Sequence, residues 1–113
     1  MSCIFCRIVE KKAQANIIYE DESIVCFNDA APQAPVHCLV IPRKHIADLF
    51  DLGEEDIPLI AHLMGKIPHI AGTLGLEKHG FRLVCNSREM AGQSVFHLHF
   101  HIMGGRSFRW PPG

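Results

Sequence analysis

Short apolar stretches recur along the chain at the length of β-strands. Those at 24–28 and 36–41 are rich in β-branched and apolar residues, and the prolines of the segment between them, 30–35, disfavour helix there. The later stretches at 81–86 and 95–103 have the same character. The pattern therefore predicts four strands, joined mostly by short loops.

One longer segment has the helical period instead. After Gly53, apolar side chains recur at every third or fourth position as far as Leu74, and Gly75 follows as a natural terminator. Pro68 lies inside this segment and predicts a kink, or a helix broken into two pieces, because proline removes one backbone hydrogen bond. One helix beside strands joined by short turns indicates an α+β domain on an antiparallel sheet.

The last predicted strand carries the most informative pattern. Side chains alternate between the two faces of a strand, so one face of 95–103 is wholly apolar and is expected to pack on the core: Phe96, Leu98, Phe100 and Ile102. The opposite face presents a row of imidazoles: His97, His99 and His101. Such a row fits a polar face that happens to use histidine, a metal site, or phosphoryl chemistry with one imidazole as the nucleophile.

The residues before this strand favour phosphoryl chemistry. Gly92 allows backbone amides to approach an anion closely, while Gln93 and Ser94 add neutral donors. Asn86, at the end of the preceding predicted strand, can reach the same place. This loop is therefore suited to hold the oxygens of a phosphate without many fixed cations.

Length, composition and charge restrict the class of protein. The chain has 113 residues, of which 48% are hydrophobic and 20% charged, and this is typical of one folded domain spanning 1–113. Eleven Lys and Arg against twelve Asp and Glu give a net charge of −1, which offers no general attraction for nucleic acid or for an anionic membrane. No apolar run approaches the roughly 20 residues of a transmembrane helix. We therefore expect a cytoplasmic protein with neither nucleic-acid nor membrane partners.

Cysteine usage leaves several interpretations open. The five cysteines are an odd count, which does not suit a closed disulfide framework. Cys26, Cys38 and Cys85 lie in apolar strand contexts and are expected in the core. Cys3 and Cys6 form a C-x-x-C pair that could be a redox pair, two structural thiols, or half of a zinc site.

The alternating histidines at 97–103 resemble the signature of the histidine-triad (HIT) superfamily. Gly92-Gln93-Ser94 before them and Gly104-Gly105-Arg106 after them make the chain most similar to the Hint branch, the histidine-triad nucleotide-binding proteins. Three further passages agree: Ile4-Phe5-x-Arg7-Ile8, Pro32-Gln33-Ala34-Pro35-Val36-His37 followed by Val40-Ile41-Pro42, and Trp110-Pro111-Pro112-Gly113. The resemblance covers essentially the whole chain. It implies a HIT fold, an antiparallel sheet of about five strands with one long helix and a short helix, assembled as a homodimer.

The resemblance also implies an activity. Proteins of the Hint branch are homodimers that hydrolyse purine nucleoside phosphoramidates, including adenylated amines. His99 would be the nucleophile that takes the nucleotidyl group, His101 would touch the phosphate, and His37 would help to orient the catalytic ring. His97 completes the catalytic set, and Ser94 would lie near the departing amine. The chemistry requires no cofactor. The alternatives are a nucleotide-binding scaffold without turnover and a HIT enzyme that cleaves dinucleoside polyphosphates.

The same resemblance implies a site for an AMP- or GMP-type purine nucleotide. Asp29 would bind the ribose hydroxyls, while Ile18 and Phe27 would sandwich the base. Trp110, in the C-terminal tail, would reach the site of the partner subunit. The remaining nucleotide contacts are expected from Ala30, Asn86, Gly92, Gln93, Ser94, His99 and His101.

Zinc is the one metal that the resemblance suggests. Some HIT proteins bind zinc through a C-x-x-C pair, a histidine after the second strand and the first histidine of the triad. Competent ligands fill all the matching positions here: Cys3, Cys6, His45 and His97. The implied zinc would be structural, because four protein ligands leave no position at which the ion could activate water.

Overall fold

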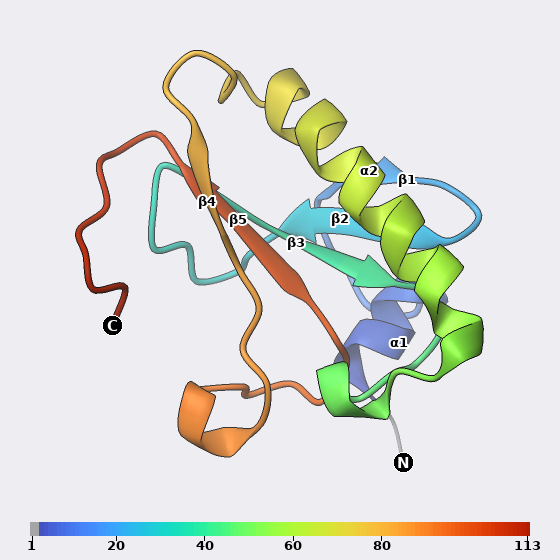
Figure 1. Ribbon diagram of the computed structural model, residues 1–113. Helices are drawn as coiled ribbons and strands as arrows, with labels where there is room; N and C mark the ends of the chain where they lie inside the picture. The colour runs from blue at the N-terminus through green and yellow to red at the C-terminus, as the bar shows by residue number, and fades with distance from the viewer. Residues whose placement is uncertain (1–2) are drawn as a thin grey trace.

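The computed structural model describes residues 3–113, which form a five-stranded antiparallel sheet with two α-helices (Figure 1). The strands are β1 (Ile17–Glu20), β2 (Ile24–Asn28), β3 (Val36–Pro42), β4 (Phe81–Val84) and β5 (Phe100–Gly104), in the spatial order β1-β2-β3-β5-β4. The helices are α1 (Ile4–Val9) and α2 (Ile57–Thr73), and short 3-10 turns occur at 49–51, 54–56 and 89–91. The α+β class is confirmed, although the apolar pattern alone missed β1. None of the helices within residues 3–113 is long and apolar enough to cross a membrane.

Helix α2 crosses one face of the sheet and buries its apolar stripe against it (Figure 1). Leu63, Ile67 and Ile70 are almost completely buried there. They pack with strand residues that include Ile24, Cys26, Cys38, Val40, Phe100 and Ile102. The predicted break at Pro68 is wrong, because the helix continues through it to Thr73. Packing of the stripe on both sides of Pro68 outweighs the loss of one backbone hydrogen bond.

Helix α1 covers the other face of the sheet. Its buried residues Phe5 and Ile8 pack with alternate residues of the central strands, namely Val25, Phe27, Leu39 and Ile41. Because strand side chains alternate, each central strand supplies both cores. The prediction for Cys26 and Cys38 is confirmed, since both are fully buried, whereas Cys85 is only half-buried.

The histidine strand is shorter than predicted. β5 begins at Phe100, and residues 97–99 have no regular secondary structure. The register pairs Val40 with Phe100, and its continuation would place Pro42 opposite Leu98. Proline has no amide hydrogen to extend the ladder, so regular pairing ends there.

The predicted alternation survives in part of this segment. Leu98, Phe100 and Ile102 are buried under α2 as expected. Phe96, expected on the same face, is instead 50% exposed. Side chains therefore alternate only from His97 onward, where the chain is held between neighbouring segments.

Candidate active site

The pairing of β3 with β5 brings two distant histidines together. The register places Leu39 opposite His101 and His37 opposite Met103. His37 is therefore the diagonal neighbour of His101 on the face that α1 covers. His37 Nε2 and His101 Nδ1 lie 2.9 Å apart.

Hydrogen bonds define which nitrogen of each ring carries the hydrogen. The amide of Gln33 donates to His37 Nδ1 at 2.9 Å, so a neutral His37 has its hydrogen on Nε2 and donates it to His101 Nδ1. His101 then carries its own hydrogen on Nε2. The expectation that His37 orients the catalytic ring is thus corrected in one respect, because His37 is hydrogen-bonded to His101 and can reach His99 only through it.

Asp29 lies beside this relay. One of its carboxylate oxygens, Oδ2, is 3.3 Å from His37 Nε2, while Oδ1 accepts a hydrogen bond of 2.8 Å from the amide of Ala31. Burial, with the neighbouring His99 and His37, lowers the pKa of His101 from 6.5 to about 4, although Asp29 acts in the opposite direction. At neutral pH His101 is therefore an uncharged ring with an N–H to donate.

His99 has a free ring nitrogen. Its Nδ1 donates to the backbone carbonyl of His97 at 2.8 Å, so the lone pair of the neutral ring is on Nε2. The residue is only 6% exposed, and its ring lies close to those of Phe5 and His101, with centroid distances of 5.2 Å and 5.1 Å. An imidazole in this state can act as a nucleophile.

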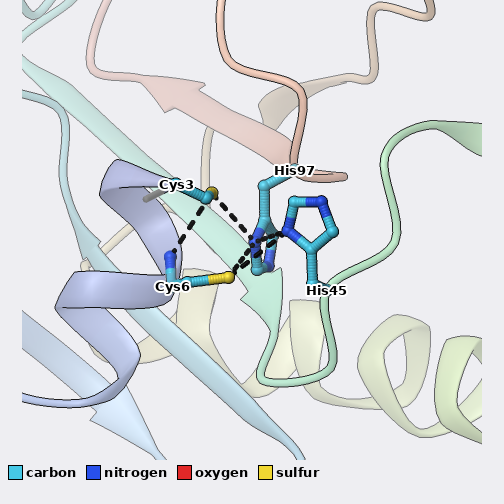
Figure 2. Close-up of side chains that lie close together, drawn as sticks. All are labelled: Cys3, Cys6, His45 and His97. Carbon is cyan, nitrogen blue, oxygen red and sulfur yellow. Dashed lines mark hydrogen bonds between the residues drawn. The ribbon is translucent and has the colours of Figure 1, made fainter. Parts of the chain in front are cut away.

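His97 is hydrogen-bonded in the opposite sense. Its Nε2 donates to the carbonyl of Pro42 at 2.8 Å, and burial lowers the pKa of the ring, which favours a neutral imidazole with its lone pair on Nδ1. That Nδ1 lies 3.5 Å from Cys3 Sγ, 3.6 Å from Cys6 Sγ and 3.2 Å from His45 Nδ1. Figure 2 shows these four side chains pointing toward one another.

Local structure explains why the four side chains converge. Cys3 is the N-cap of α1, and its sulfur accepts a hydrogen bond of 3.5 Å from the amide of Cys6, so both thiols lie at the same end of the helix. His45 is in the loop after β3. That loop is tied to the segment before β5, because the amide of Leu98 donates to the carbonyl of Ile46 at 2.6 Å.

The distances within this cluster fit one tetrahedral metal ion. Zinc bonds of about 2.3 Å to sulfur and about 2.0 Å to nitrogen place neighbouring donors about 3.3–3.8 Å apart. The four donor atoms lie within 4.8 Å of one another, and the separation of Cys6 Sγ and His45 Nδ1 is 3.3 Å. Two thiols and two imidazoles form a ligand set that suits zinc. The second compact group, Asp29 with His37 and His101, is accounted for by the hydrogen-bonded relay.

Gln93 has a different role from the one expected. Its side chain is buried, with Oε1 accepting from the amide of Arg88 at 2.6 Å. Its Nε2 donates to the carbonyls of Ala47 and Val95 at 2.7 Å and 3.1 Å. This corrects the expected phosphate contact, because the side chain already forms hydrogen bonds within the protein and stabilises the loop through them.

Arg88 is a further residue of this loop that the sequence did not indicate. Its φ of 73° with ψ of −179° belongs to a region that residues other than glycine rarely adopt. The side chain is held by Asp48, 2.9 Å from Nε, and the guanidinium lies 4.3 Å from the ring centroid of Phe50. These contacts hold the Arg88 side chain at the start of the loop before the triad.

The expected base sandwich is wrong. Ile17 pairs with Phe27 across β1 and β2, and alternation therefore turns Ile18 toward the α2 core while Phe27 faces the α1 core. The aromatic ring that does face Phe27 is Phe5, with centroids 5.3 Å apart. No local pattern could have shown that this helix residue meets the strand.

The other predicted contact residues lie on the surface. Ala30 and Ser94 are exposed and Asn86 is half-buried, so a ligand can reach all three. Gly92 has a φ of 92°, a conformation that favours glycine. Trp110 is 84% exposed in the single chain.

Known proteins are similar to this chain over nearly its whole length. A family model described as "Scavenger mRNA decapping enzyme C-term binding" matches residues 2–108. An uncharacterized HIT-like protein of Synechococcus elongatus is 46% identical over 110 residues, which are 97% of this chain and 96% of that protein. The crystal structure of a HIT family hydrolase from Legionella pneumophila has a TM-score of 0.96 at 42% identity, covering 99% of this chain and 100% of that one. A histidine triad nucleotide-binding protein from Candida albicans has a TM-score of 0.84 at 26% identity, covering 97% and 83%.

Proposed function

This chain belongs to the HIT-like family, and we propose that it is a purine nucleoside phosphoramidase that cleaves P–N bonds through a nucleotidyl intermediate on His99. The observation that carries the proposal is the hydrogen bond of 2.8 Å from His99 Nδ1 to the carbonyl of His97. A carbonyl can only accept, so in the neutral ring the lone pair is on Nε2. From that nitrogen the neutral ring can attack phosphorus.

The relatives support the general class of reaction. The Legionella protein is named a hydrolase and the Candida protein a nucleotide-binding protein. A hydrolase that acts on a nucleotide is the coarse function that these names favour for this chain. The P–N bond and the purine base are finer statements, which rest on the Hint-like motifs of the sequence.

Two displacements at phosphorus complete the reaction. In the first, Nε2 of His99 forms a bond to phosphorus as the P–N bond breaks, and the amine leaves with a proton supplied by solvent through the hydroxyl of Ser94. In the second, water attacks phosphorus and releases a proton to solvent while the bond to His99 breaks. The products are a nucleoside monophosphate and a free amine.

His101 is proposed to hold the phosphate during both steps. The relay from Gln33 through His37 leaves His101 with an Nε2–H that can donate to a phosphate oxygen. The amides of Gly92 and Gln93 donate to the carbonyls of Glu89 and Arg88 at 3.0 Å and 3.1 Å, so they stabilise the loop beside the phosphate rather than the phosphate itself. This end of the site would stabilise the negative charge of the transition state.

We further propose that the predicted ligands Cys3, Cys6, His45 and His97 hold a structural zinc ion. When bound, the ion supplies a fixed tetrahedral link between the N-terminal turn of α1 and the segment before β5. The four protein ligands leave it no role in activating water. Their donor distances and their sulfur and nitrogen chemistry support the proposal.

Homodimerisation is the remaining part of the proposal, with residues 107–113 reaching the neighbouring site. The exposed Trp110 supports it, as does the edge strand β4, whose Phe81 and Leu83 are 38% and 36% exposed. Sedimentation at micromolar concentration should show a dimer, and deletion of 107–113 should change substrate preference more than fold. A fully active monomer would contradict the shared site.

The central experiment compares wild-type protein with His99→Ala on adenosine phosphoramidate. We expect the wild type to release AMP and His99→Ala to lose at least about 1,000-fold in rate. A substrate with a good leaving group should leave an adduct that peptide mass mapping places on His99. His79→Ala, which changes an exposed histidine outside the site, is the control.

Three outcomes would redirect the assignment. An adduct on His97 or His101, with His99→Ala still active, would contradict the choice of nucleophile. Binding of AMP without turnover of any substrate would indicate a nucleotide-binding scaffold. Faster cleavage of a dinucleoside polyphosphate than of the phosphoramidate would indicate P–O–P chemistry instead.

A further inference from the structure

The ring of Phe5 lies where the metal-ligand cluster meets the nucleophile. Phe5 occupies α1 between Cys3 and Cys6 and is 7% exposed. Its ring is nearly perpendicular to that of His99, at 88° with centroids 5.2 Å apart, and its centroid is 6.0 Å from that of His97. One helical turn therefore presents two thiols to His97 and an aromatic ring to His99.

The ring of His99 needs contacts that hold its orientation, because the χ2 torsion of histidine has a broad and roughly two-fold distribution. Rotation by about 180° exchanges Nδ1 with Cδ2 and turns the nucleophilic lone pair away from the substrate. The hydrogen bond to the His97 carbonyl opposes this rotation, and the neighbouring rings of Phe5 and His101 restrict it further. Of these two neighbouring rings, His101 is held by a hydrogen bond to His37, whereas Phe5 is held by its place in α1 and by packing in the core beneath it.

We propose that Phe5 is a positioning residue for His99, and that metal binding by the Cys3–Cys6 turn holds Phe5 against that ring. The proposal rests on the proposed role of His99 and on the fit of the four donors to a metal ion. Metal occupancy would then raise kcat although the metal takes no part in the chemistry.

Phe5→Leu tests the contact itself, because leucine keeps the apolar bulk and removes the ring. The loss of one aromatic contact predicts a fall in kcat of about 3- to 10-fold with KM changed by less than about 2-fold. Val25→Ala, which removes buried volume from the same core without an aromatic ring, is the matched control and should keep kcat. A rise in KM at unchanged kcat, or an equal fall of kcat in both variants, would overturn the positioning role.

His45→Gln tests the link to the metal, since His45 is an exposed ligand on a different segment from Phe5. The kcat of His45→Gln should also fall by about 3- to 10-fold. The kcat of the double variant Phe5→Leu/His45→Gln should be no lower than that of the less active single variant. Losses that multiply in the double variant would mean that Phe5 and the metal act independently, which overturns the coupling.

Nitrogen NMR of the imidazoles reports on the ring of His99 without any substrate. In the zinc-loaded wild type we expect one His99 form with the hydrogen on Nδ1, and we expect that signal to broaden or disappear in Phe5→Leu and in His45→Gln but not in Val25→Ala. Unchanged His99 signals in both variants would overturn the proposal. If the signals change as expected while no phosphoramidate is cleaved, the proposed function fails and the positioning by Phe5 stands.

Discussion

His97 and His101 flank the same nucleophile, yet their surroundings give them opposite roles. His97 donates to the carbonyl of Pro42 and turns an unprotonated Nδ1 toward two thiols and an imidazole. His101 Nδ1 accepts a hydrogen bond from His37 Nε2, so the neutral ring carries its own hydrogen on Nε2. In each ring, the hydrogen-bond partner of one nitrogen therefore decides whether the other nitrogen can bind a metal ion or donate to a phosphate. Two identical side chains on one segment thereby acquire different chemistry.

Substitution of His101, the proposed phosphate donor, should have the largest effect on activity. His101→Ala is expected to lower kcat by about 100- to 1,000-fold, because a donor to the developing charge is lost. Zinc content should stay as in the wild type, since no metal ligand is changed. Steady-state kinetics and elemental analysis check both statements, with His79→Ala as the control. Loss of zinc in His101→Ala would show that the proposed phosphate site and the proposed zinc site are not independent.

Substitution of the proposed zinc ligands Cys3 and Cys6 should act mainly on stability. We expect about one zinc per chain, lost in Cys3→Ser/Cys6→Ser, with a fall of about 2–4 kcal/mol in the free energy of unfolding. Activity at low temperature should remain measurable, since the nucleophile is still present. Elemental analysis and denaturant unfolding measure these effects. The control Cys85→Ser should change neither the zinc content nor the free energy of unfolding strongly. A wild-type protein prepared without chelator but free of metal would refute the site.

Acid should destabilise the folded protein through the half-buried His101. Its folded-state pKa of about 4 lies below the ordinary 6.5, so the unfolded chain takes up the proton first as pH falls. Stability present above pH 6.5 should therefore be lost progressively toward pH 4, by about 1–2 kcal/mol after allowance for partial exposure of the ring. Denaturant unfolding at pH 7 and pH 5 tests this. His101→Asn should reduce the pH dependence and His79→Gln should not. An equal dependence in all three proteins would contradict it.

Asp29→Asn should have the smallest effect, because it alters only the charge beside the relay. The substitution can keep the hydrogen bond to the Ala31 amide and removes the negative charge 3.3 Å from His37 Nε2. We expect kcat to fall by about 2- to 3-fold, with stability within about 0.5 kcal/mol of the wild type. A rise in KM at constant kcat would instead support the ribose contact implied by the family resemblance.

Part of the site could be predicted from short stretches of sequence. The alternation of His97, His99 and His101 with apolar residues identified the row, and the C-x-x-C spacing identified two thiols at one helix end. The partners of these groups came from the family resemblance, since neither His37 nor His45 lies near the row in the chain. The expected base sandwich is wrong because the register of β1 on β2, which short stretches of sequence do not show, turns Ile18 and Phe27 to opposite faces of the sheet.

The sequence by itself determined the elements whose signals are local. Strands over 24–28 and 36–41, the apolar stripe of the long helix and the row of imidazoles all follow from neighbouring residues. Only the tertiary structure decided that α2 runs through Pro68, that Gln93 is bonded inside its loop, and that Phe5 lies against His99. These outcomes depend on contacts between segments that are distant in the chain. A slip of one residue in the pairing of β3 with β5 would turn His37 away from His101, and such a register is set by packing across the whole sheet.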